Sequence, residues 1–425
     1  MPRTYPGGYA QIPYDSFLDQ VRASSPEGKS LIVKKESDAP RWDIGQPDDR
    51  VVRIEYEVDL HRMEREIRDS VSVSKARSGY VGLLGYSVFA YLDGMEDRAI
   101  NLEIQAPSAW PVLTTLSPEV PAPLANAKAQ APDYSALADS EILMGPDLQL
   151  QRFDGKVPLV LAVYAEAEEN TALEGQLARE ALDRVQTYFG DTPFQHYTVQ
   201  LELLKPLPEH EYGFSQEHMD SGTFSLSIAR AITVHTSSEE RHIALFNYAH
   251  HMAHCWIPKR VYGVGYRPFT WEMTPVIDTI WFNEGFGRYA AIEALAAGMP
   301  PAEAAAFRER HLSRLRKILG EAPTFLRKMP LLVLSREASF LYADDFRTGM
   351  NVFSRGALMA AEMDNRIREN TGGKKSLRDA LQFLLRWSEK NNRAFQLDEL
   401  PQLLSQGASV DVRDIFDRWL KPLVE

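Results

Sequence analysis

The alternation of apolar and polar residues changes along the chain, from strand-like in the first part to helix-like in the second. Between residues 51 and 116 the segments are short and alternate with a period of two, which is typical of antiparallel strands. They are VVRIEYEVDL (51–60), YSVFAYLDG (86–94) and INLEIQA (100–106). The one helix candidate in this region lies around residues 62–70. We therefore expect an N-terminal antiparallel β domain.

A proline-rich stretch separates this region from the rest. Residues 117–133, SPEVPAPLANAKAQAPD, contain four prolines and several alanines without periodicity. Such a composition favours a linker over a helix or a strand. It predicts a boundary near residue 125, so that the β domain comprises residues 1–125.

Strands and one long helix alternate between residues 126 and 236. The predicted strands are VPLVLAVYAEA (157–167), HYTVQLELL (196–204) and TFSLSIARAITVHT (223–236), with a helix at residues 171–189 that Gly190 closes. These elements indicate a small mixed sheet with a helix packed on it. From Ser237 to the end, every strong signal is helical, so residues 237–425 are predicted to form a helical subdomain. The predicted fold class is α+β.

Length and composition set limits on this picture. A chain of 425 residues is long enough for two or three domains, and 44% hydrophobic with 25% charged residues is ordinary for a soluble globular protein. The net charge of −12 comes from acidic residues spread along the chain, which argues against nucleic acid as a partner. No apolar run reaches about 18 residues, so no membrane span is expected.

The compartment and the oligomeric state stay open. The start, MPRTYPGGYAQIPYD, has no basic and apolar leader, so we expect no export signal in the chain as given. A leader removed upstream would place the protein in the periplasm or outside the cell. The single cysteine, Cys255, excludes an intrachain disulfide but says little about the compartment.

A histidine cluster carries the candidate chemistry. Ser237 and Glu240 resemble a capping box, which predicts a helix over about residues 238–256. On that helix His250 and His254 are four residues apart and lie on one face, so both imidazoles can reach one zinc ion. Glu284, in the next helical stretch WFNEGF, is the expected third ligand. The pattern alone leaves metal binding and a solvated histidine face open.

The surrounding residues resemble a known family. HHMAHCWIPKR resembles the glycyl aminopeptidase family of gluzincin metallopeptidases, in which H-E-x-x-H is followed by x-W-x-x-K-R, here Trp256, Lys259 and Arg260. WFNEGF resembles the third-ligand helix of gluzincins. Further segments that resemble this family are MPRTYPGGYAQIPYDSF, GYVGLLGYSVFAYL with SAWPVLTTL, and RGALMAAEMDNRIRENTGGKKSLRDAL. The resemblance therefore spans nearly the whole chain.

This resemblance implies both a fold and an activity. It implies an N-terminal β domain followed by a thermolysin-like catalytic domain, with one zinc ion held by His250, His254 and Glu284. It also implies peptide substrates that are cleaved near their N-terminus. Lys259 and Arg260 either pair with carboxylates that hold the site together or lie exposed at the helix end, where cations suit the helix dipole.

Two positions depart from the active pattern. The family places a glutamate after the first histidine as the general base, and here that residue is His251. A tyrosine often precedes x-K/R-G on a later helix, where its hydroxyl stabilises the oxyanion, but the matching FSRG places Phe353 there. Tyr342 is the one substitute hydroxyl that we consider. Both departures remove groups on which proton transfer and oxyanion stabilisation depend.

A third departure concerns substrate binding. YGFSQEHMDS (212–221) resembles the family segment Gly-Gly-x-Glu-His-x-x-Ser, an edge strand whose glutamate holds the free amine of the substrate. Glu217, His218 and Ser221 match this segment. Phe214 and Ser215 replace its glycines and are expected to narrow the cleft. An ordinary surface carboxylate in a turn is the alternative interpretation of Glu217.

Three hypotheses about function follow. The leading one is a zinc-binding pseudoenzyme of the metallopeptidase class, with absent or much reduced peptidase activity. The second is an active zinc-dependent aminopeptidase in which His251 or another group is the base. The third is a metal-free module that binds a peptide or a protein in the cleft that the resemblance assigns to the substrate.

Overall fold

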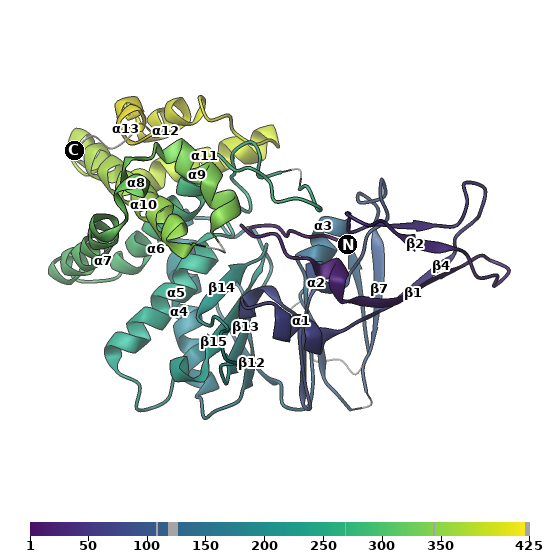
Figure 1. Cartoon of the computed structure of the whole chain (residues 1–425). Helices are drawn as coiled ribbons and strands as arrows, with labels where there is room; N and C mark the ends of the chain where they lie inside the picture. The colour runs from purple at the N-terminus through teal and green to yellow at the C-terminus, as the bar shows by residue number, and fades with distance from the viewer. Residues whose placement is uncertain (108, 118–125, 268, 343–344, 421–425) are drawn as a thin grey trace.

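The computed structural model describes residues 1–107, 109–117, 126–267, 269–342 and 345–420. A β-rich N-terminal part, a five-stranded sheet and a large helical part follow one another along the chain (Figure 1). The predicted order, an antiparallel β domain followed by a mixed sheet and a helical subdomain, is confirmed. Within the described residues no helix is both long and apolar enough to cross a membrane.

The N-terminal part contains one four-stranded antiparallel sheet and three two-stranded ones. The four-stranded sheet has the order β5 (Lys75–Arg77), β6 (Tyr80–Leu84), β10 (Glu141–Met144) and β8 (Val112–Thr114). The pairs are β1 (Leu18–Ser24) with β4 (Arg53–Val58), β2 (Val33–Lys35) with β3 (Trp42–Ile44), and β7 (Ile100–Gln105) with β9 (Asn126–Ala131). The short helices are α1 (Leu60–Glu66), α2 (Gly85–Val88) and α3 (Tyr134–Ala138).

One predicted strand in this part is wrong. Residues 86–94 form no strand; the chain leaves β6 and turns into the short helix α2. The Gly85 N–H donates to the carbonyl of Ser140, and the buried ring of Tyr86 stacks on Tyr5 at 4.3 Å. Tyr86 and Val88 are buried whereas Leu92 is exposed, so the alternation in 86–94 does not correspond to one buried strand face. Tertiary packing against the N-terminal segment decided the outcome.

The predicted linker falls partly on residues 118–125, which lie outside the described residues. Directly after them, β9 pairs with β7, and β10 pairs with β6 and β8. These pairings join residues 126–144 to the N-terminal sheets. The division into residues 1–125, 126–236 and 237–425 stays a prediction, and the pairings favour a boundary closer to residue 146.

The second sheet has five strands in the order β11-β12-β13-β15-β14. Their bounds are β11 (Gln149–Phe153), β12 (Leu159–Ala165), β13 (Tyr197–Leu204), β14 (Phe214–Glu217) and β15 (Ser221–Ser227). The central strands β12, β13 and β15 are parallel, whereas the edge strands β11 and β14 are antiparallel to their neighbours. The sheet is therefore mixed, as predicted. The strand predicted for 223–236 is shorter, because the chain leaves the sheet after Ser227.

Helix α4 (Thr171–Phe189) connects the parallel strands β12 and β13 and ends at Gly190, whose φ of 81° is the left-handed conformation that glycine adopts without strain. The helical part follows from Ser238. Its helices are α5 (Ser238–Ala253), η4 (Trp281–Phe286), α6 (Gly287–Ala296), α7 (Pro301–Glu321), α8 (Thr324–Lys328), α9 (Leu331–Leu341), α10 (Phe346–Thr371), α11 (Leu377–Asn391), α12 (Leu400–Ala408) and α13 (Arg413–Trp419). Their apolar faces pack with α4 and the sheet into one large core.

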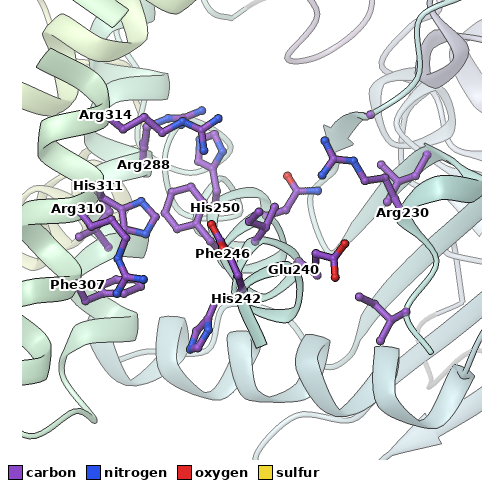
Figure 2. Close-up of a pocket in the computed structure, with 18 of the residues that line it drawn as sticks. Arg230, Glu240, His242, Phe246, His250, Arg288, Phe307, Arg310, His311 and Arg314 are labelled. Carbon is purple, nitrogen blue, oxygen red and sulfur yellow. The ribbon is translucent and has the colours of Figure 1, made fainter. Parts of the chain in front are cut away.

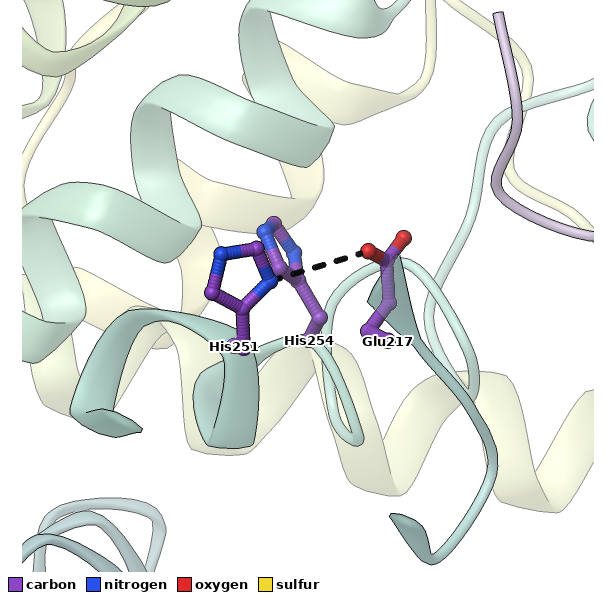
Figure 3. Close-up of side chains that lie close together, drawn as sticks. All are labelled: Glu217, His251 and His254. Carbon is purple, nitrogen blue, oxygen red and sulfur yellow. Dashed lines mark ion pairs between the residues drawn. The ribbon is translucent and has the colours of Figure 1, made fainter. Parts of the chain in front are cut away.

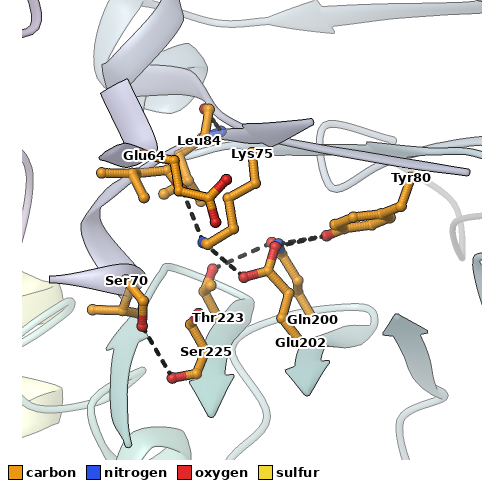
Figure 4. Close-up of polar contacts among 12 residues, drawn as sticks. Glu64, Ser70, Lys75, Tyr80, Leu84, Gln200, Glu202, Thr223 and Ser225 are labelled. Atoms are coloured by element: carbon orange, nitrogen blue, oxygen red, sulfur yellow. Dashed lines mark hydrogen bonds and ion pairs between the residues drawn. The ribbon is translucent and has the colours of Figure 1, made fainter. Parts of the chain in front are cut away.

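A buried ion pair joins the N-terminal part to the five-stranded sheet. Nζ of Lys75 on β5 lies 2.8 Å from Oε2 of Glu202 on β13, and both side chains are buried (Figure 4). The Tyr80 hydroxyl and the Gln200 amide also donate to Oε1 of Glu202. A buried charge is stable only when it is paired and hydrogen-bonded, so this cluster fixes how the two sheets meet.

Candidate metal centre and peptide cleft

Helix α5 begins where the sequence predicted. The Ser237 hydroxyl accepts from the Glu240 N–H while the Glu240 carboxylate accepts from the Ser237 N–H, which is a complete capping box. The helix ends at Ala253 and not at residue 256. The N–H groups of His254, Cys255 and Trp256 donate to carbonyls three residues back instead of four, so the α-helix passes into tighter turns after Ala253. His250 and His254 nevertheless lie on one face.

Three side chains converge as a metal-ligand set. Nε2 of His250 lies 3.7 Å and Nε2 of His254 lies 3.4 Å from Oε2 of Glu284. All three side chains are buried, and their ligand atoms lie within 4.8 Å of one another. Two imidazoles and one carboxylate are a donor set that zinc accepts. The structure thus brings together the three residues that the sequence selected.

The hydrogen bonds of these histidines fit a metal ligand set. Nδ1 of His254 donates to the Ile257 carbonyl at 2.8 Å, which leaves Nε2 free to ligate. Nε2 of His250 and of His254 are buried without a hydrogen-bond partner. Burial alone would lower the pKa of His254, but the carboxylates of Glu284 and Glu217 outweigh it and raise the pKa to about 9. A metal ion in the centre would compete with protons for the ring nitrogens of these histidines.

Close helix packing positions Glu284. Residues Trp281–Phe286 form a π-helical turn that leads into α6. A Cβ atom at Gly356 of α10 would lie 1.9 Å from the Trp281 carbonyl oxygen, and one at Gly285 would lie 2.4 Å from the Gly356 backbone. Only glycine therefore permits this crossing, which holds Glu284 opposite α5. The π-helical turn is of a kind that is frequent at functional sites.

The N-terminal segment reaches the centre, and the sequence patterns did not predict this. The buried hydroxyl of Tyr9 donates to Oε1 of Glu284 at 3.2 Å. A Cβ at Gly7, whose φ is +93°, would lie 2.6 Å from Oε1 of Glu217. Residues 7–9 therefore contact both glutamates of the centre. The only sequence signal was the Gly-Gly-Tyr run itself, which does not identify its partners.

His251 is not one of the three residues of the metal triad, and its Nδ1 is turned toward Glu217 on the edge strand β14. Its Nδ1 lies 4.0 Å from Oε2 of Glu217, as Figure 3 shows. Burial, and after it His254 and Arg288, lower the pKa of His251 well below the ordinary value, so the contact joins a neutral imidazole to a carboxyl group. Glu217, His251 and His254 form a second possible ligand group. Because both groups use Nε2 of His254, one ion excludes the other.

The position at which the family pattern predicts a tyrosine holds Phe353, which has no hydroxyl. Phe353 on α10 is buried, and its ring stacks on Tyr342 at 5.6 Å. The Tyr342 ring also packs edge-on against Tyr9 at 5.7 Å. A Cβ at Gly349 would lie 2.2 Å from Tyr342, so this glycine makes room for the ring. The catalytic role of Tyr342 stays a prediction.

Of the predicted substrate-binding residues, the edge strand β14 carries Glu217, whereas His218 follows it and Ser221 begins β15. Glu217 is buried and near the histidines, so it is not a surface carboxylate in a turn. The Phe214 ring packs against Phe346 at 5.4 Å, and the Ser215 hydroxyl accepts from the Asn247 amide at 3.2 Å. Both side chains therefore occupy space beside the strand. Their effect on substrate entry stays a prediction.

His218 and Ser221 point away from open space. Nδ1 of His218 lies 3.2 Å from Asp139, and its Nε2 lies 3.1 Å from the Thr223 hydroxyl. Ser221 is fully buried. Both ring nitrogens of His218 are thus engaged with protein groups. A direct contact of these two residues with substrate stays a prediction that this arrangement does not favour.

Lys259 holds the N-terminal segment at the centre. Its Nζ donates to Oδ1 of Asp139 at 3.1 Å and to the Pro6 carbonyl at 2.9 Å, and the side chain is buried. Burial would raise the pKa of Asp139, but Lys259 and then His218 lower it to about 2. Of the two alternatives, pairing with a carboxylate is therefore correct for Lys259. Arg260 instead donates to the carbonyls of Met219, Cys255 and Pro193.

Comparisons with known proteins found one family model for the N-terminal part and similar folds for the whole chain. Residues 1–146 match the model of the Peptidase M61 N-terminal domain. An aminopeptidase N family protein from Idiomarina loihiensis matches with a TM-score of 0.84 and 20% identity, covering 100% of this chain and 71% of that one. An M1 zinc metallopeptidase from Deinococcus radiodurans matches with a TM-score of 0.57 and 15% identity, covering 96% and 86%. A comparison with curated protein sequences gave no match.

Fold, site and comparisons together define a class. The chain resembles gluzincin-like metallopeptidases, with an M61-type N-terminal domain in front and the two-domain architecture of M1 aminopeptidases throughout. The recognised family resemblance is thereby confirmed at the level of class. That His251 occupies the general-base position stays a prediction from the sequence.

Proposed function

We propose that this chain binds one zinc ion through His250, His254 and Glu284, holds a peptide beside it, and hydrolyses peptides very slowly or not at all. One observation carries the proposal: the predicted general-base position holds an imidazole instead of a carboxylate, His251, whose Nδ1 lies 4.0 Å from Oε2 of Glu217. Bound zinc would supply Lewis acidity that polarises a peptide carbonyl and lowers the pKa of water. The protein group that normally accepts the proton is missing.

The remaining groups of the cleft suit binding better than turnover. Glu217 offers a buried carboxylate whose Oε1 has no hydrogen-bond partner, which is a suitable acceptor for a peptide ammonium group. Phe353 adds an apolar wall where an oxyanion donor is expected. A mutant of the Deinococcus radiodurans M1 metallopeptidase has been solved with a Tyr-Ser-Ala substrate, which supports a peptide as the ligand class for this fold.

General acid–base catalysis contributes roughly 10²–10⁴-fold to such reactions, and one oxyanion donor contributes roughly 10²–10³-fold. Here His251 replaces the expected glutamate and Phe353 replaces the expected tyrosine, so both contributions are reduced. We therefore expect residual activity to lie several orders of magnitude below that of a complete centre.

A second candidate, an active aminopeptidase, has one observation in its favour. A histidine beside a carboxylate is an arrangement that can serve as a general base, because the carboxylate orients the ring. His251 and Glu217 lie 4.0 Å apart, which is longer than a hydrogen bond but close enough to shorten when a ligand binds. In this hypothesis Glu217 would orient the base instead of binding the substrate amine.

The test combines metal analysis with turnover on the purified chain. We expect one zinc per chain, calorimetric binding of short peptides with a free amine, and no turnover of glycyl or alanyl anilides above the level of the zinc-free protein. Turnover that is lost on chelation and on His251→Ala would establish the active aminopeptidase instead. Peptide binding without any bound metal would establish the metal-free binding module.

A further inference from the structure

A cavity adjoins the candidate metal centre. It has a volume of about 680 Å³ and lies between α5, α6 and α7, with the start of α10 at one side. His250 lines it, so one wall of the cavity is also a wall of the metal triad. Figure 2 shows side chains of α5 and α7 facing each other across it. A volume of this size accommodates a small ligand or the end of a peptide.

Cations dominate the polar lining of this cavity. Four arginines line it: Arg230, Arg288, Arg310 and Arg314. Across the described parts of the chain, none of their side chains has a hydrogen bond or an ion pair with a protein group. The carboxylates in the lining are Glu239 and Glu240, and Glu240 is bound to Ser237 in the capping box. We call this the arginine pocket.

Arg288 is the innermost of these cations. It lies one helical turn after Glu284, its Nε is buried without a hydrogen-bond partner, and its Cζ lies 5.8 Å from the ring centre of Phe246. Burial, opposed in part by Glu284, lowers the pKa of Arg288, and Arg314 lowers it further. Arg310 and Arg314 are exposed at the rim. The charge therefore extends from the solvent to the metal centre.

The pKa of His311 reflects burial and the positive charge of the arginine pocket. Its ring lies 4.5 Å from the rings of both Phe246 and Phe307. Burial and then Arg288, Arg310 and Arg314 lower the pKa of His311 to about 4. The histidine is therefore neutral near pH 7 and adds no cation of its own. The aromatic rings around it give the pocket an apolar floor.

These features suit a carboxylate attached to an aliphatic chain. Guanidinium groups bind carboxylates through paired, charge-assisted hydrogen bonds, and cations left without a counter-ion favour an anionic ligand. The apolar lining, which includes Ile292, Phe307 and Leu315, suits the methylene groups that precede such a carboxylate.

We propose that the arginine pocket binds a carboxylate of the peptide whose amino end lies at the metal centre. This inference rests on the proposed peptide-binding function and names the ligand class further. The carboxylate has two sources, the C-terminus of a short peptide or an acidic side chain. The pocket thereby selects peptides by negative charge.

The experiment uses the zinc-loaded full chain and matched peptides in a calorimeter. The set is Ala-Ala-Gln-amide, which has no carboxylate, Ala-Ala-Gln with a free C-terminus, and Ala-Ala-Glu-amide. We expect roughly 10- to 100-fold tighter binding for a peptide with a carboxylate than for the neutral one. A preference for Ala-Ala-Gln identifies the C-terminus as the source, and a preference for Ala-Ala-Glu-amide identifies the side chain.

Variants of the pocket arginines test whether these residues cause the preference for peptides with a carboxylate. Arg288→Gln and Arg314→Gln should remove most of the preference, whereas Arg316→Gln should leave it intact, because Arg316 lies on the same helix α7 and pairs with Glu309 at 2.8 Å. Zinc content is measured for each variant, so that loss of the metal is distinguished from loss of the anion contact. Reduced preference with stoichiometric zinc supports the inference.

Two results would overturn the inference while leaving the proposed function intact. They are equal binding of neutral and acidic peptides by the unmodified chain, and a preference that survives both pocket variants. Binding of inorganic phosphate that needs Arg288 and Arg314, together with indifference to peptide carboxylates, would replace the peptide by a phosphate ligand. If no peptide of any charge binds, the proposed peptide-binding function fails, and the inference fails with it.

Discussion

The Nδ1 atom of His251 lies 4.0 Å from the Oε2 atom of Glu217, while the Nε2 atom of His254 is shared between that pair and the triad of His250, His254 and Glu284. One histidine therefore links two overlapping ligand groups. Only one of them can hold an ion at a time, because each needs the same lone pair. The contact between His251 and Glu217 therefore bears both on which group of residues holds the ion and on whether His251 can act as a base.

The first prediction concerns the ion. We expect stoichiometric zinc in the unmodified chain, and its loss in His254→Ala, His250→Ala and Glu284→Gln, because zinc needs all three donors. His251→Ala and Glu217→Gln should keep the metal. Elemental analysis of each purified variant checks this, and His242→Ala, an exposed histidine on the same helix, is the control. Zinc that survives His250→Ala but not His251→Ala would assign the ion to the second group.

The second prediction concerns restored catalysis. His251→Glu combined with Phe353→Tyr should raise turnover of alanyl anilides by roughly 10²-fold or more, because proton transfer and oxyanion stabilisation would both be supplied. Each single change should give less than the pair, since both act on one transition state. Phe214 and Ser215 are expected to limit the gain for larger substrates.

Two controls accompany these variants. Adding His254→Ala to the pair should abolish turnover, which excludes a contaminating peptidase. Tyr342→Phe in the His251→Glu background tests whether Tyr342 already supplies the hydroxyl. Turnover of the unmodified chain at the level of the double variant would show that His251 does not mark a disabled site.

The third prediction concerns Tyr9. Its hydroxyl donates to Oε1 of Glu284, the oxygen other than the one nearest the histidines. Groups that orient a metal ligand in this way typically contribute a factor of roughly 10 to 100 in metal affinity. Tyr9→Phe should therefore weaken zinc binding by that factor without unfolding the chain. Competition with a zinc chelator measures it, and Tyr164→Phe on strand β12 is the matched control, in which affinity should not change.

The fourth prediction concerns pH and stability. Glu174 at the start of α4 is buried, accepts from the Tyr248 hydroxyl of α5 at 2.9 Å, and has its pKa raised by burial from 4.5 to about 7. Between these values the folded chain keeps a proton that the unfolded chain loses. The stabilisation is therefore complete below about pH 4.5 and is lost as the pH rises through 7.

Glu174→Gln should remove this dependence, because the amide stays neutral. Between low pH and pH 8, the free energy of unfolding should fall by about 3 kcal/mol less in the variant than in the unmodified chain. Urea unfolding at pH 5, 6, 7 and 8 measures the difference, with the exposed Glu168→Gln as control. Parallel stability curves for the Glu174→Gln variant and the unmodified chain would show that Glu174 is ionised in both states.

Local patterns were sufficient for part of this protein. The capping box at Ser237 and Glu240 starts α5, Gly190 ends α4, and the spacing of His250 and His254 places both on one face. These features depend on residues within about one or two helical turns, so they are visible in the sequence. The π-helical turn at 281–286 and the short helix α2 were not predicted, because packing against distant segments selects them.

The rest was decided by contacts between residues far apart in the chain. Tyr9 and Glu284 are 275 positions apart, and the arginine pocket draws its lining from α5, α6, α7 and the end of the five-stranded sheet. No periodicity encodes such pairs, because the free energy that forms them comes from burying whole elements against one another. The sequence by itself predicted most of the helices and strands and selected His250, His254 and Glu284 as the candidate ligand set. Only the tertiary structure determined that His251 faces Glu217 and that unpaired arginines lie beside the metal centre.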